Sequence, residues 1–432
     1  MKMANMDDYF DVVIIGTGAA GLYCALNLPA RYRILLLTKQ KADESDSFLA
    51  QGGICMQHGE ADYRPFFDDT MRAGHYENTP ATVDLMIRSS NSIIRDLVRR
   101  GVRFARDDHG ALRFTREGAH SRPRILFHED ITGHEITQTL LNEVLRFENI
   151  ELREHTTLLD FFADASACGG VIAAGPDGEP RAIGAGAVVL ACGGIGGLYK
   201  NSTNFPHITG DAIAMALRHG VACEHLDYIQ IHPTTLYSHR KGRRFLISES
   251  VRGEGALLLD KNGNRFTNEL QPRDVVSAAI RAQMEKDGTD HVWEDMRPIG
   301  EAAIREHFPN ILERCEEEGY DPIHEPIPVV PAQHYFMGGI TADLSSRTAL
   351  PRLYACGETC CNGVHGRNRL ASNSLLESLV FAQRAADDIL YGEPPVFTGD
   401  KPDLAPYREQ EPLFAAYRQE VLTAIERSKN HE

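Results

Sequence analysis

Apolar and polar residues alternate along this chain in blocks that predict a mixed α/β fold. Two short apolar runs, at residues 11–15 and 33–37, flank a segment with helical spacing at 19–28. Short continuous apolar runs are typical of parallel strands that are buried on both faces. We therefore expect the chain to begin with a strand, a glycine-rich turn, a helix and a second strand.

The same patterns predict further elements downstream. Apolar runs predict strands at residues 157–163, 170–174, 187–191, 337–344 and 353–357. Helical spacing predicts helices at 81–100, 133–147 and 211–219, with another helix that begins near Asn373. A proline-rich linker at 393–406 leads to an amphipathic helix, whose apolar stripe carries Leu413, Tyr417, Val421 and Ile425.

One stretch breaks this alternation. Residues 221–333 form a mixed segment that is rich in charge, and the strand and glycine patterns return after it. We predict that residues 1–220 and 334–392 form one domain and that 221–333 form an inserted α+β capping domain. Residues 393–432 would form the linker and a short helical C-terminal tail. Such an insertion would lie over a ligand that both flanks hold.

Composition excludes several functional classes. The chain has 432 residues and a formal net charge of −16, which argues against a nucleic-acid partner because nucleic acid requires a basic surface. No uninterrupted apolar stretch is long enough to span a membrane. Residues 1–10 have neither the basic start nor the apolar core of a signal peptide. We therefore expect a soluble cytoplasmic protein with no membrane partner.

The cysteines suit a reducing compartment. Nine cysteines are scattered without a CxxC pair, which favours reduced thiols over a disulfide framework. Cys356, Cys360 and Cys361 are close in sequence, but the adjacent pair is poor ligand spacing for zinc. We expect no metal site, and a zinc site at these three residues stays an alternative.

A glycine-rich turn follows the first predicted strand. Gly16-Thr17-Gly18-Ala19-Ala20-Gly21 joins an apolar strand to a helix, which is the context of a dinucleotide-binding turn. The first glycine makes the tight turn, the second lets the backbone approach a pyrophosphate, and the third lets the helix pack on the strand. The phosphates would then lie at the positive end of the helix. A glycine-rich turn without a ligand stays the alternative.

The acidic residue that usually binds the ribose hydroxyls is missing. Thr38-Lys39 stands about twenty positions after the turn, where a carboxylate is expected. A lysine could pair with a phosphate but would not bind ribose as a carboxylate does. The turn alone therefore does not decide between NAD and FAD.

Five motifs follow one another along the chain: Ala50-Gln51-Gly52-Gly53-Ile54, His232-Pro233-Thr234, Arg252-Gly253-Glu254-Gly255, Arg273-Asp274, and Arg369 with Ser372-Asn373-Ser374-Leu375. Together they resemble the flavoprotein family of succinate dehydrogenase, fumarate reductase and L-aspartate oxidase, with the greatest likeness to L-aspartate oxidases. The resemblance covers about residues 10–390. It implies a Rossmann-like FAD-binding domain that is split by a mobile capping domain. Many L-aspartate oxidases continue into a C-terminal helical bundle, of which this chain is expected to have one helix.

The resemblance also implies how FAD is held. The contacts fall on Gly16, Thr17, Gly18, Ala19, Ala20, Gly21, Lys39, Asp46, Ser47, Phe48, Leu49, Ala50, Gln51, Gly52, Gly53, Asp211, Glu358, Ser374 and Leu375. In the membrane-complex enzymes a histidine five residues before the motif's glutamine binds FAD covalently, and here that position is Asp46. An aspartate cannot form this bond, so we expect FAD to be non-covalent. Glu358 also follows a predicted strand end, where α/β sheets bind ligands.

Glu117 distinguishes between members of the family. It matches the glutamate that L-aspartate oxidases present to the substrate ammonium, where succinate enzymes carry an uncharged residue. Succinate and aspartate differ only by that amino group, so a facing carboxylate discriminates between them by charge. The alternative is a solvated surface glutamate beside Arg116 and Arg122.

The resemblance implies a clamp for two substrate carboxylates, which need cationic or imidazole donors. The family positions for this clamp are His232, His334 and Arg369, with Ser248 as a hydroxyl donor. Gln230 lies two residues from His232, on the same face of a strand. A structural role for any single histidine stays the alternative.

Arg273 matches the family's proton donor or acceptor, with Glu249 and Arg252 as its relay. With a pKa above about 12, arginine is an acid that can protonate reduced fumarate but a poor base. Aspartate oxidation could avoid a carbon base, because hydride can leave Cα for flavin N5 as the amine lone pair drives it. The sequence leaves both routes open. For Arg273 the alternative is an ion pair with Asp274 at a helix start.

The resemblance therefore implies an FAD-dependent oxidoreductase that converts L-aspartate to iminoaspartate, with dioxygen or fumarate as acceptor and fumarate or succinate as further ligands. Such enzymes catalyse the first step of de novo NAD biosynthesis. Quinolinate synthase, which takes the unstable imine, is expected as a transient partner. The alternatives are a soluble fumarate reductase or succinate-oxidising flavoprotein, and a flavin-binding sensor or assembly subunit that has lost catalysis.

Overall fold

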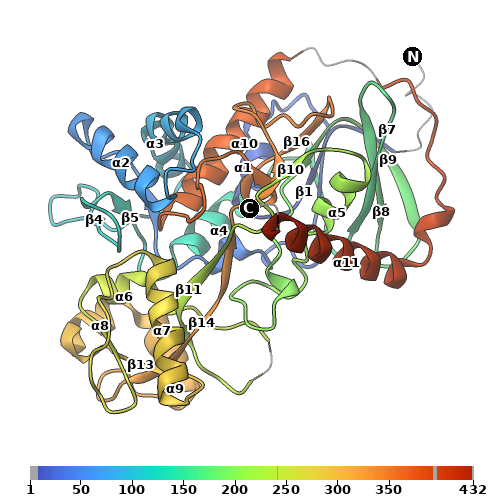
Figure 1. Ribbon diagram of the computed structural model, residues 1–432. Helices are drawn as coiled ribbons and strands as arrows, with labels where there is room; N and C mark the ends of the chain where they lie inside the picture. The colour runs from blue at the N-terminus through green and yellow to red at the C-terminus, as the bar shows by residue number, and fades with distance from the viewer. Residues whose placement is uncertain (1–7, 241, 393–396, 431–432) are drawn as a thin grey trace.

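The computed structural model describes residues 8–240, 242–392 and 397–430. A large body fills the upper part of Figure 1, and a smaller body lies below it. Two of the sequence predictions concern residues outside the described ones. They are the linker at 393–406, of which residues 393–396 are not described, and the segment tested for a signal peptide, of which 1–7 are not described.

Among the described residues, seven strands form the main sheet of the large body. They are β1 (Tyr9–Ile15), β2 (Ile34–Leu37), β6 (Ile150–Arg153), β7 (Thr157–Ala163), β8 (Cys168–Ala174), β9 (Pro180–Leu190) and β16 (Leu353–Ala355). The order is β6-β2-β1-β9-β8-β7, and β16 also pairs with β9. The pairs that join β6, β2, β1, β9 and β16 are parallel, whereas β7, β8 and β9 pair antiparallel. The mixed α/β class that the sequence predicts is confirmed.

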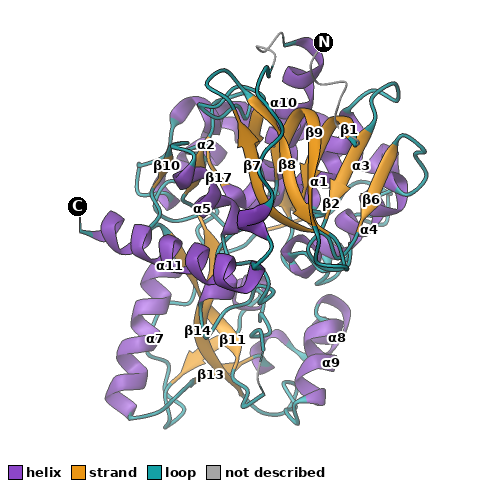
Figure 2. Ribbon diagram, turned by 90° about the vertical axis from the view of Figure 1, so that its right-hand side faces the viewer, coloured by secondary structure: helices purple, strands orange, loops and turns teal. Residues whose placement is uncertain are grey.

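Helices cover both faces of this sheet (Figure 2). One face packs against α1 (Ala19–Asn27), α3 (Pro80–Arg100), α4 (Thr132–Val144) and α10 (Asn373–Tyr391). The other face packs against α5 (Asp211–Arg218) and α11 (Gln410–Lys429). Along β1, Val12 and Ile14 belong to the first core and Val13 and Ile15 to the second. Burial on both faces explains why the first strands carry uninterrupted apolar runs.

Most of the predicted elements are confirmed. The strand at 157–163 coincides with β7, and the helix at 81–100 begins one residue earlier as α3. The apolar stripe of α11 buries Tyr417, Val421 and Ile425 against the second core. The strand predicted at 337–344 is shorter in the structure, where β15 spans only Gly339–Thr341. The pattern does not predict α2 (Tyr63–Ala73), which buries the polar Asp69 and Thr70 together with its apolar residues.

The smaller body, here called the cap region, spans residues 229–336. Its antiparallel sheet has the order β11-β14-β13-β12, formed by β11 (Ile229–Leu236), β14 (Ile327–Phe336), β13 (Val292–Asp295) and β12 (Leu257–Leu259). Its helices are α6 (Glu249–Gly253), α7 (Arg273–Asp287), α8 (Glu301–His307) and α9 (Pro309–Glu317). A separate apolar core fills it, with Val251, Val276 and Val292 among its members. The strand β14 continues past residue 333, where the sequence analysis ends the inserted domain. The domain limits at 221 and 333 stay a prediction.

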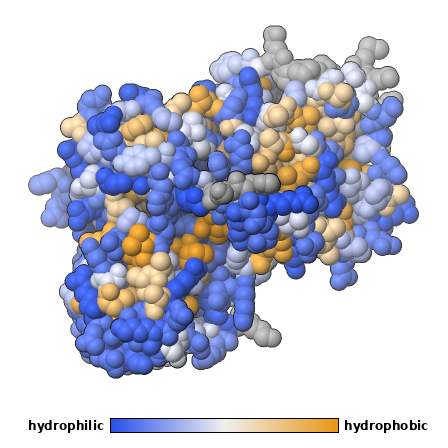
Figure 3. Space-filling view, viewed as in Figure 1, coloured by the Kyte–Doolittle hydropathy of each residue, from blue (hydrophilic) through white to orange (hydrophobic). Residues whose placement is uncertain are grey.

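Two small sheets complete the fold. One contains β3 (Ile54–Cys55), β5 (Ile125–Leu126) and β4 (Phe114–Thr115), and the other contains β10 (Cys223–Glu224), β15 and β17 (Cys360–Cys361). The face drawn in Figure 3 is mostly hydrophilic, with apolar side chains gathered where the cap region meets the large body. Within the described part of the chain, no helix combines the length and apolar character that crossing a membrane requires.

Candidate active site

A cavity of about 380 Å³ lies where the main sheet faces the cap region. Ile15, Ala191 and Cys356, at the carboxyl ends of β1, β9 and β16, line one side of it. His232 and Arg273 line it from the cap region. The carboxyl ends of parallel strands are the usual place for a ligand in an α/β sheet. The cavity therefore has a large-body end and a cap end, which differ in chemistry.

The glycine turn forms the large-body end. Gly16 has φ +114°, and a Cβ atom there would lie 2.1 Å from the carbonyl oxygen of Ala191. A Cβ atom on Gly21 would lie 2.0 Å from the carbonyl oxygen of Gly16, so Gly21 lets α1 pack closely on the turn. Gly18 is the N-cap residue of α1, and its own Cβ position is 3.1 Å from Ser47 Oγ. The turn thus presents backbone and the start of a helix to the cavity, as anion binding requires.

The structure brings together nearly all the predicted FAD contacts. Of the described residues expected to touch FAD, all except Ala19 and Gly21 line the cavity. Ala19 is instead fully buried in the apolar core under the sheet, and its backbone N–H donates to Ser47 Oγ at 3.0 Å. Lys39, at the position where an acidic residue is usual, forms an ion pair of 2.6 Å with Asp211. A carboxylate therefore reaches this end of the cavity from α5 instead.

Several buried polar atoms on the large-body side fit a ligand rich in hydrogen-bonding groups. Ser45 Oγ, Asp46 Oδ2 and Gln51 Oε1 are buried and find no partner among the residues that the structure describes. All three residues line the cavity. Buried polar atoms without partners are rare in folded proteins, so their clustering indicates a place for a polar ligand. Together with the glycine cradle, they fit the phosphates and ribityl hydroxyls of FAD.

The buried surroundings of Asp46 oppose a negative charge on its carboxyl group. Its Oδ1 accepts a hydrogen bond from the backbone N–H of Phe205 at 2.9 Å. Burial raises the pKa of Asp46 to about 7. Burial also raises the pKa of Glu358 to about 8, and Glu358 Oε1 accepts from the backbone N–H of Phe336 at 2.9 Å. Both side chains can therefore be neutral donors to a bound ligand near pH 7.

The cap end is built from side chains that come from many elements. His232 comes from β11, His334 from β14, Arg273 from the first turn of α7, and Arg369 from the loop before α10. Ser248 is the N-cap residue of α6, and its Oγ accepts from Ser250 N at 3.3 Å. All five residues of this predicted clamp and acid line the cavity together with Glu117 and Glu249. The spacing along the chain is long, yet the fold places these side chains around one space.

The clamp carries positive charge and unpaired donors. Arg369 donates to Ser374 Oγ at 2.9 Å, while its buried Nε has no partner in the described part of the chain. Burial lowers the pKa of Arg369 to about 10, so it stays charged at neutral pH. Burial, with Arg273 nearby, lowers the pKa values of His232 and His334 far enough that both rings are neutral. Two arginines and two neutral imidazoles suit a ligand with two carboxylates.

Glu117 is buried, with only 4% of its surface exposed, so the alternative of a solvated surface glutamate is wrong. Its two carboxylate oxygens accept from Ser250 Oγ at 3.0 Å and from Ser372 Oγ at 2.6 Å. A Cβ atom on Gly52 would lie 2.3 Å from Glu117 Oε1, so any larger residue there would displace the Glu117 carboxylate. Burial and neighbouring Glu249 raise the pKa of Glu117 above its usual value. A ligand cation placed here would favour its charged form.

Arg273 contacts the residues that the sequence predicts as its relay. Its Nε donates to Glu249 Oε2 at 2.6 Å, and Arg252 Nη2 lies 3.8 Å from the same oxygen. Burial alone would raise the pKa of Glu249, but Arg273 and Arg252 outweigh it and hold the pKa below its usual value. The structure does not support the alternative of an ion pair between Arg273 and Asp274. Arg273 pairs with Glu249, and Asp274 contacts His75 at 3.1 Å.

Two predicted site residues, Gln230 and Arg252, are not among the described residues that line the cavity, so they lie behind its wall. Gln230 Oε1 accepts from Arg273 Nη1 at 2.9 Å. Gln230 Nε2 donates to Asn368 Oδ1 and to the carbonyl oxygen of Arg369, both at 2.8 Å. These contacts use the oxygen and both N–H groups of the amide. The sequence places Gln230 against the substrate, but its amide instead holds Arg273 and the loop of Arg369.

Sequence reasoning misses two groups at this site. The first is Ser250, whose hydroxyl donates to Glu117. Its place two residues after Ser248 is a signal in the sequence that could have indicated this role. Asp130, from the loop before α4, accepts from the backbone N–H of Ile311 at 2.8 Å and from Asn310 Nδ2 at 2.6 Å. It thereby caps α9 of the cap region from the large body. Nothing in the local sequence around Asp130 indicates this contact.

The cysteines near the site are all free thiols. Cys356, Cys360 and Cys361 are buried, and burial raises the pKa of each thiol. Among the described residues, no three histidine, cysteine, aspartate or glutamate side chains gather as a metal ion would require. The neutral thiols at these positions are poor metal ligands, because the thiolate is the ligand form.

Comparisons with known proteins give the family. Residues 11–375 match the family described as FAD binding domain. The L-aspartate oxidase of Clostridium perfringens is 47% identical over 380 residues, which are 88% of this chain and 86% of that protein. The L-aspartate oxidase of Nostoc sp. is 44% identical over 98% of this chain and 76% of that protein.

A solved structure shares the arrangement. A quinol–fumarate reductase with menaquinol molecules superposes with a TM-score of 0.84 at 32% identity, over 95% of this chain and 75% of that chain. The split fold, the glycine turn and the lining of the cavity agree with these likenesses. The chain therefore belongs to the L-aspartate oxidase family of FAD-binding proteins.

Proposed function

We propose that this protein oxidises L-aspartate to iminoaspartate, with FAD bound at the large-body end of the cavity and the substrate at the cap end. The observation that carries the proposal is Glu117, a buried carboxylate that lines the cavity beside a cluster of arginines and histidines. L-aspartate has two carboxylates and one ammonium. The cap end offers cationic and imidazole donors to the carboxylates and one acidic group to the ammonium.

The chain's own side chains would bind and orient the substrate. Arg369, His232 and His334 hold the two carboxylates, and Ser248 adds a hydroxyl donor. Glu117 accepts from the ammonium, and this third contact would fix the orientation of Cα in the cavity. FAD, when bound, supplies the acceptor for the hydride that leaves Cα. Ser372 and Ser250 keep the Glu117 carboxylate in place, where it would take the proton that the ammonium loses before the amine lone pair can drive hydride loss.

Arg273 would serve the reverse type of reaction, in which fumarate accepts electrons. Its guanidinium can give a proton to the substrate carbon, and Glu249 and Arg252 can return one to it. Gln230 fixes the plane of the guanidinium through the bond to Nη1. Aspartate oxidation does not require Arg273 as a carbon base, because the amine lone pair can drive hydride loss without one.

The likeness to a quinol–fumarate reductase supports a second candidate, a fumarate-reducing or succinate-oxidising flavoprotein. Both candidates use the same clamp and the same Arg273. They differ at Glu117, since neither succinate nor fumarate has an ammonium for this carboxylate to bind. Its burial in the cavity lining favours L-aspartate as the donor.

The proposal has consequences for the protein's surroundings. Dioxygen or fumarate would take the electrons. The oxidation would be the first step of de novo NAD biosynthesis, and the unstable imine would pass to a consuming enzyme of quinolinate-synthase type. Nine free thiols support a cytoplasmic setting.

Asp46 supports non-covalent FAD, so acid or heat should release the flavin from the polypeptide. Flavin fluorescence that stays with the denatured chain in a gel would contradict that expectation.

An anaerobic spectrum tests the function most simply. The purified yellow protein is mixed with L-aspartate without oxygen, and flavin absorbance is recorded before and after. We expect L-aspartate to bleach the flavin and fumarate to restore it. Succinate at the same concentration is the control. Bleaching by succinate but not by L-aspartate would support the second candidate instead.

A further inference from the structure

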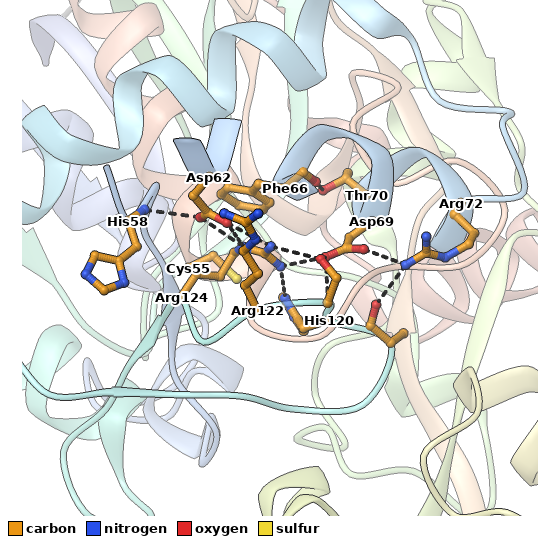
Figure 4. Close-up of polar contacts among 12 residues, drawn as sticks. Cys55, His58, Asp62, Phe66, Asp69, Thr70, Arg72, His120, Arg122 and Arg124 are labelled. Carbon is orange, nitrogen blue, oxygen red and sulfur yellow. Dashed lines mark hydrogen bonds and ion pairs between the residues drawn. The ribbon is translucent and has the colours of Figure 1, made fainter. Parts of the chain in front are cut away.

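A buried cluster lies next to the active site and has no part in the proposed reaction. Arg124 is fully buried, and its guanidinium contacts Asp62 at 3.0 Å and Asp69 at 2.8 Å (Figure 4). The same guanidinium stacks over the ring of Phe66 at 5.0 Å. Arg124 Nη1 also lies 2.8 Å from Nδ1 of His120. Neither Arg124 nor His120 is among the described residues that line the cavity.

These contacts fix the tautomer of His120. An arginine guanidinium has only donors, so Nδ1 of His120 must be the acceptor. Nε2 then carries the proton and donates to the carbonyl oxygen of Ala371 at 3.0 Å. Burial and the charge of Arg124 lower the pKa of His120 to about 4. The neutral ring with its proton on Nε2 is therefore the form present at neutral pH.

The bond to Ala371 joins two loops that carry groups at the cap end of the cavity. In the first loop, the backbone N–H of His120 donates to the carbonyl oxygen of Glu117 at 3.3 Å. In the second loop, Ser372 follows Ala371 and donates through its hydroxyl to Glu117 Oε2 at 2.6 Å. The two loops are thus tied at one end by the His120 ring and at the other by the Glu117 carboxylate.

Both loops have a backbone conformation that needs support. Ala119 has φ 64° and Ser372 has φ 61°, in the left-handed region that residues with side chains rarely adopt. Such residues persist only where surrounding contacts determine their conformation. His120 directly follows Ala119 in one loop, and its ring hydrogen-bonds the carbonyl oxygen of the residue before Ser372 in the other.

We propose that His120 is a positioning residue for substrate choice. Held by Arg124, its ring locks the Glu117 turn to the Ser372 loop and so fixes the Glu117 carboxylate in the cavity. The inference rests on the proposed function, in which Glu117 faces the ammonium of L-aspartate. Fumarate has no ammonium, so its reduction depends less on where this carboxylate lies.

Two amide variants separate the two bonds of the ring. In His120→Asn, the short side chain places its oxygen near the position of Nδ1, where it can still accept from Arg124 but cannot reach Ala371. In His120→Gln, the longer side chain places its N–H near the position of Nε2 and keeps the bond to Ala371. His58→Asn is the matched control, because His58 is an exposed histidine of the same region whose ring stacks on Phe114 at 4.1 Å.

The measured quantity is the ratio of kcat/KM for L-aspartate to kcat/KM for fumarate, on FAD-loaded protein. We expect His120→Asn to lower this ratio on the order of tenfold, as the loss of one buried hydrogen bond allows. We expect His120→Gln and His58→Asn to stay within about threefold of wild type. An unchanged ratio in His120→Asn, or an equal loss of both activities, overturns the inference.

A measurement without turnover judges the arrangement separately. Nitrogen-15 NMR of histidine-labelled, FAD-loaded protein should show the His120 ring neutral and protonated at Nε2. Protonation at Nδ1 overturns the inference whatever the kinetics show. A wild-type protein that reduces fumarate but does not oxidise L-aspartate overturns the proposed function, and this inference with it. A wild type that oxidises L-aspartate, with an unchanged ratio in His120→Asn, overturns the inference alone.

Discussion

The two ends of the cavity are built in different ways. Much of the large-body end comes from two continuous stretches of chain, the glycine turn and the segment from Asp46 to Gly53. The cap end consists of long charged or aromatic side chains from two helices, two strands and two loops. A site made of backbone constrains a short stretch of sequence, because few residue types allow the backbone to come so close. A site made of side chains depends on how distant elements pack.

The interiors behind the two ends also differ. The main sheet packs on both faces against apolar helices. Both bodies bury charged side chains, but they differ in how these are paired. In the large body, buried Arg124 pairs with Asp62 and Asp69. The cap region buries Glu249, Arg252 and Glu294, and neither carboxylate oxygen of Glu294 has a partner in the described part of the chain. Buried charges are unfavourable unless they are paired, so this polar interior indicates that chemistry, and not stability, determines part of its sequence. The predictions below test that contrast.

The largest effect is expected at Arg273. Arg273→Lys keeps the charge but removes the planar group that Glu249 and Gln230 hold. General acid catalysis contributes about 10²- to 10⁴-fold, so fumarate reduction should fall by at least roughly a hundredfold. FAD content and succinate binding should persist. The measurement is fumarate reduction by the FAD-loaded variant, and an activity within a few-fold of wild type would remove Arg273 from its proposed role.

The next effect concerns stability. Glu294 in β13 is fully buried, and neither carboxylate oxygen has a partner in the described part of the chain. Burial raises its pKa from 4.5 to about 8. Because the folded-state pKa is the higher one, the folded state is favoured at low pH and loses stability as the pH rises through this range. Glu294→Leu should therefore raise the free energy of unfolding, by on the order of 3 kcal/mol at pH 7.

Urea unfolding of wild type and Glu294→Leu at pH 5 and pH 8 checks this sign. The gap in midpoint should be small at pH 5 and should widen at pH 8. Glu294→Gln, which keeps the shape but cannot ionise, is the control and should also lose the pH dependence. An equal gap at both pH values would mean that the carboxyl group does not titrate as proposed.

The smallest effect is expected where the two bodies meet. Asp130 caps α9 of the cap region, and a cap of this kind contributes about 1 kcal/mol. Asp130→Ala should therefore loosen the cap region and raise KM by roughly fivefold for L-aspartate and for fumarate alike. Glu313→Ala, an exposed change on the same helix, is the control. A change in KM for only one substrate would show that Asp130 acts on the substrate and not on the cap region.

The sequence predicts the large-body end better than the cap end for a physical reason. The turn from Gly16 to Gly21 is local, and the structure confirms the predicted steric causes for Gly16 and Gly21. The sequence pattern does not predict the helix α2, because one of its buried residues is the polar Asp69. Asp69 is paired with Arg124, which lies in a loop 55 residues further along the chain. A polar residue that a distant partner satisfies leaves no apolar pattern in its own helix.

At the cap end, the family resemblance supplies the residues and the packing supplies their geometry. The sequence alone does not distinguish a buried Glu117 from a surface glutamate, because the burial comes from Gly52, Ser250 and Ser372 in other segments. The same holds for Gln230, whose amide turns to Arg273 and away from the cavity. Local pattern does not show which of two neighbouring side chains faces a cavity when both are buried.

The central claim is that Glu117 selects L-aspartate by its charge. Glu117→Gln keeps the shape of the side chain and removes the charge, and kinetics of both half-reactions on one preparation test it. We expect kcat/KM for L-aspartate to fall roughly ten- to hundredfold, equal to about 1.5–3 kcal/mol, with fumarate reduction nearly unchanged. If both activities fall together, or if neither changes, Glu117 does not choose the substrate and the account is contradicted.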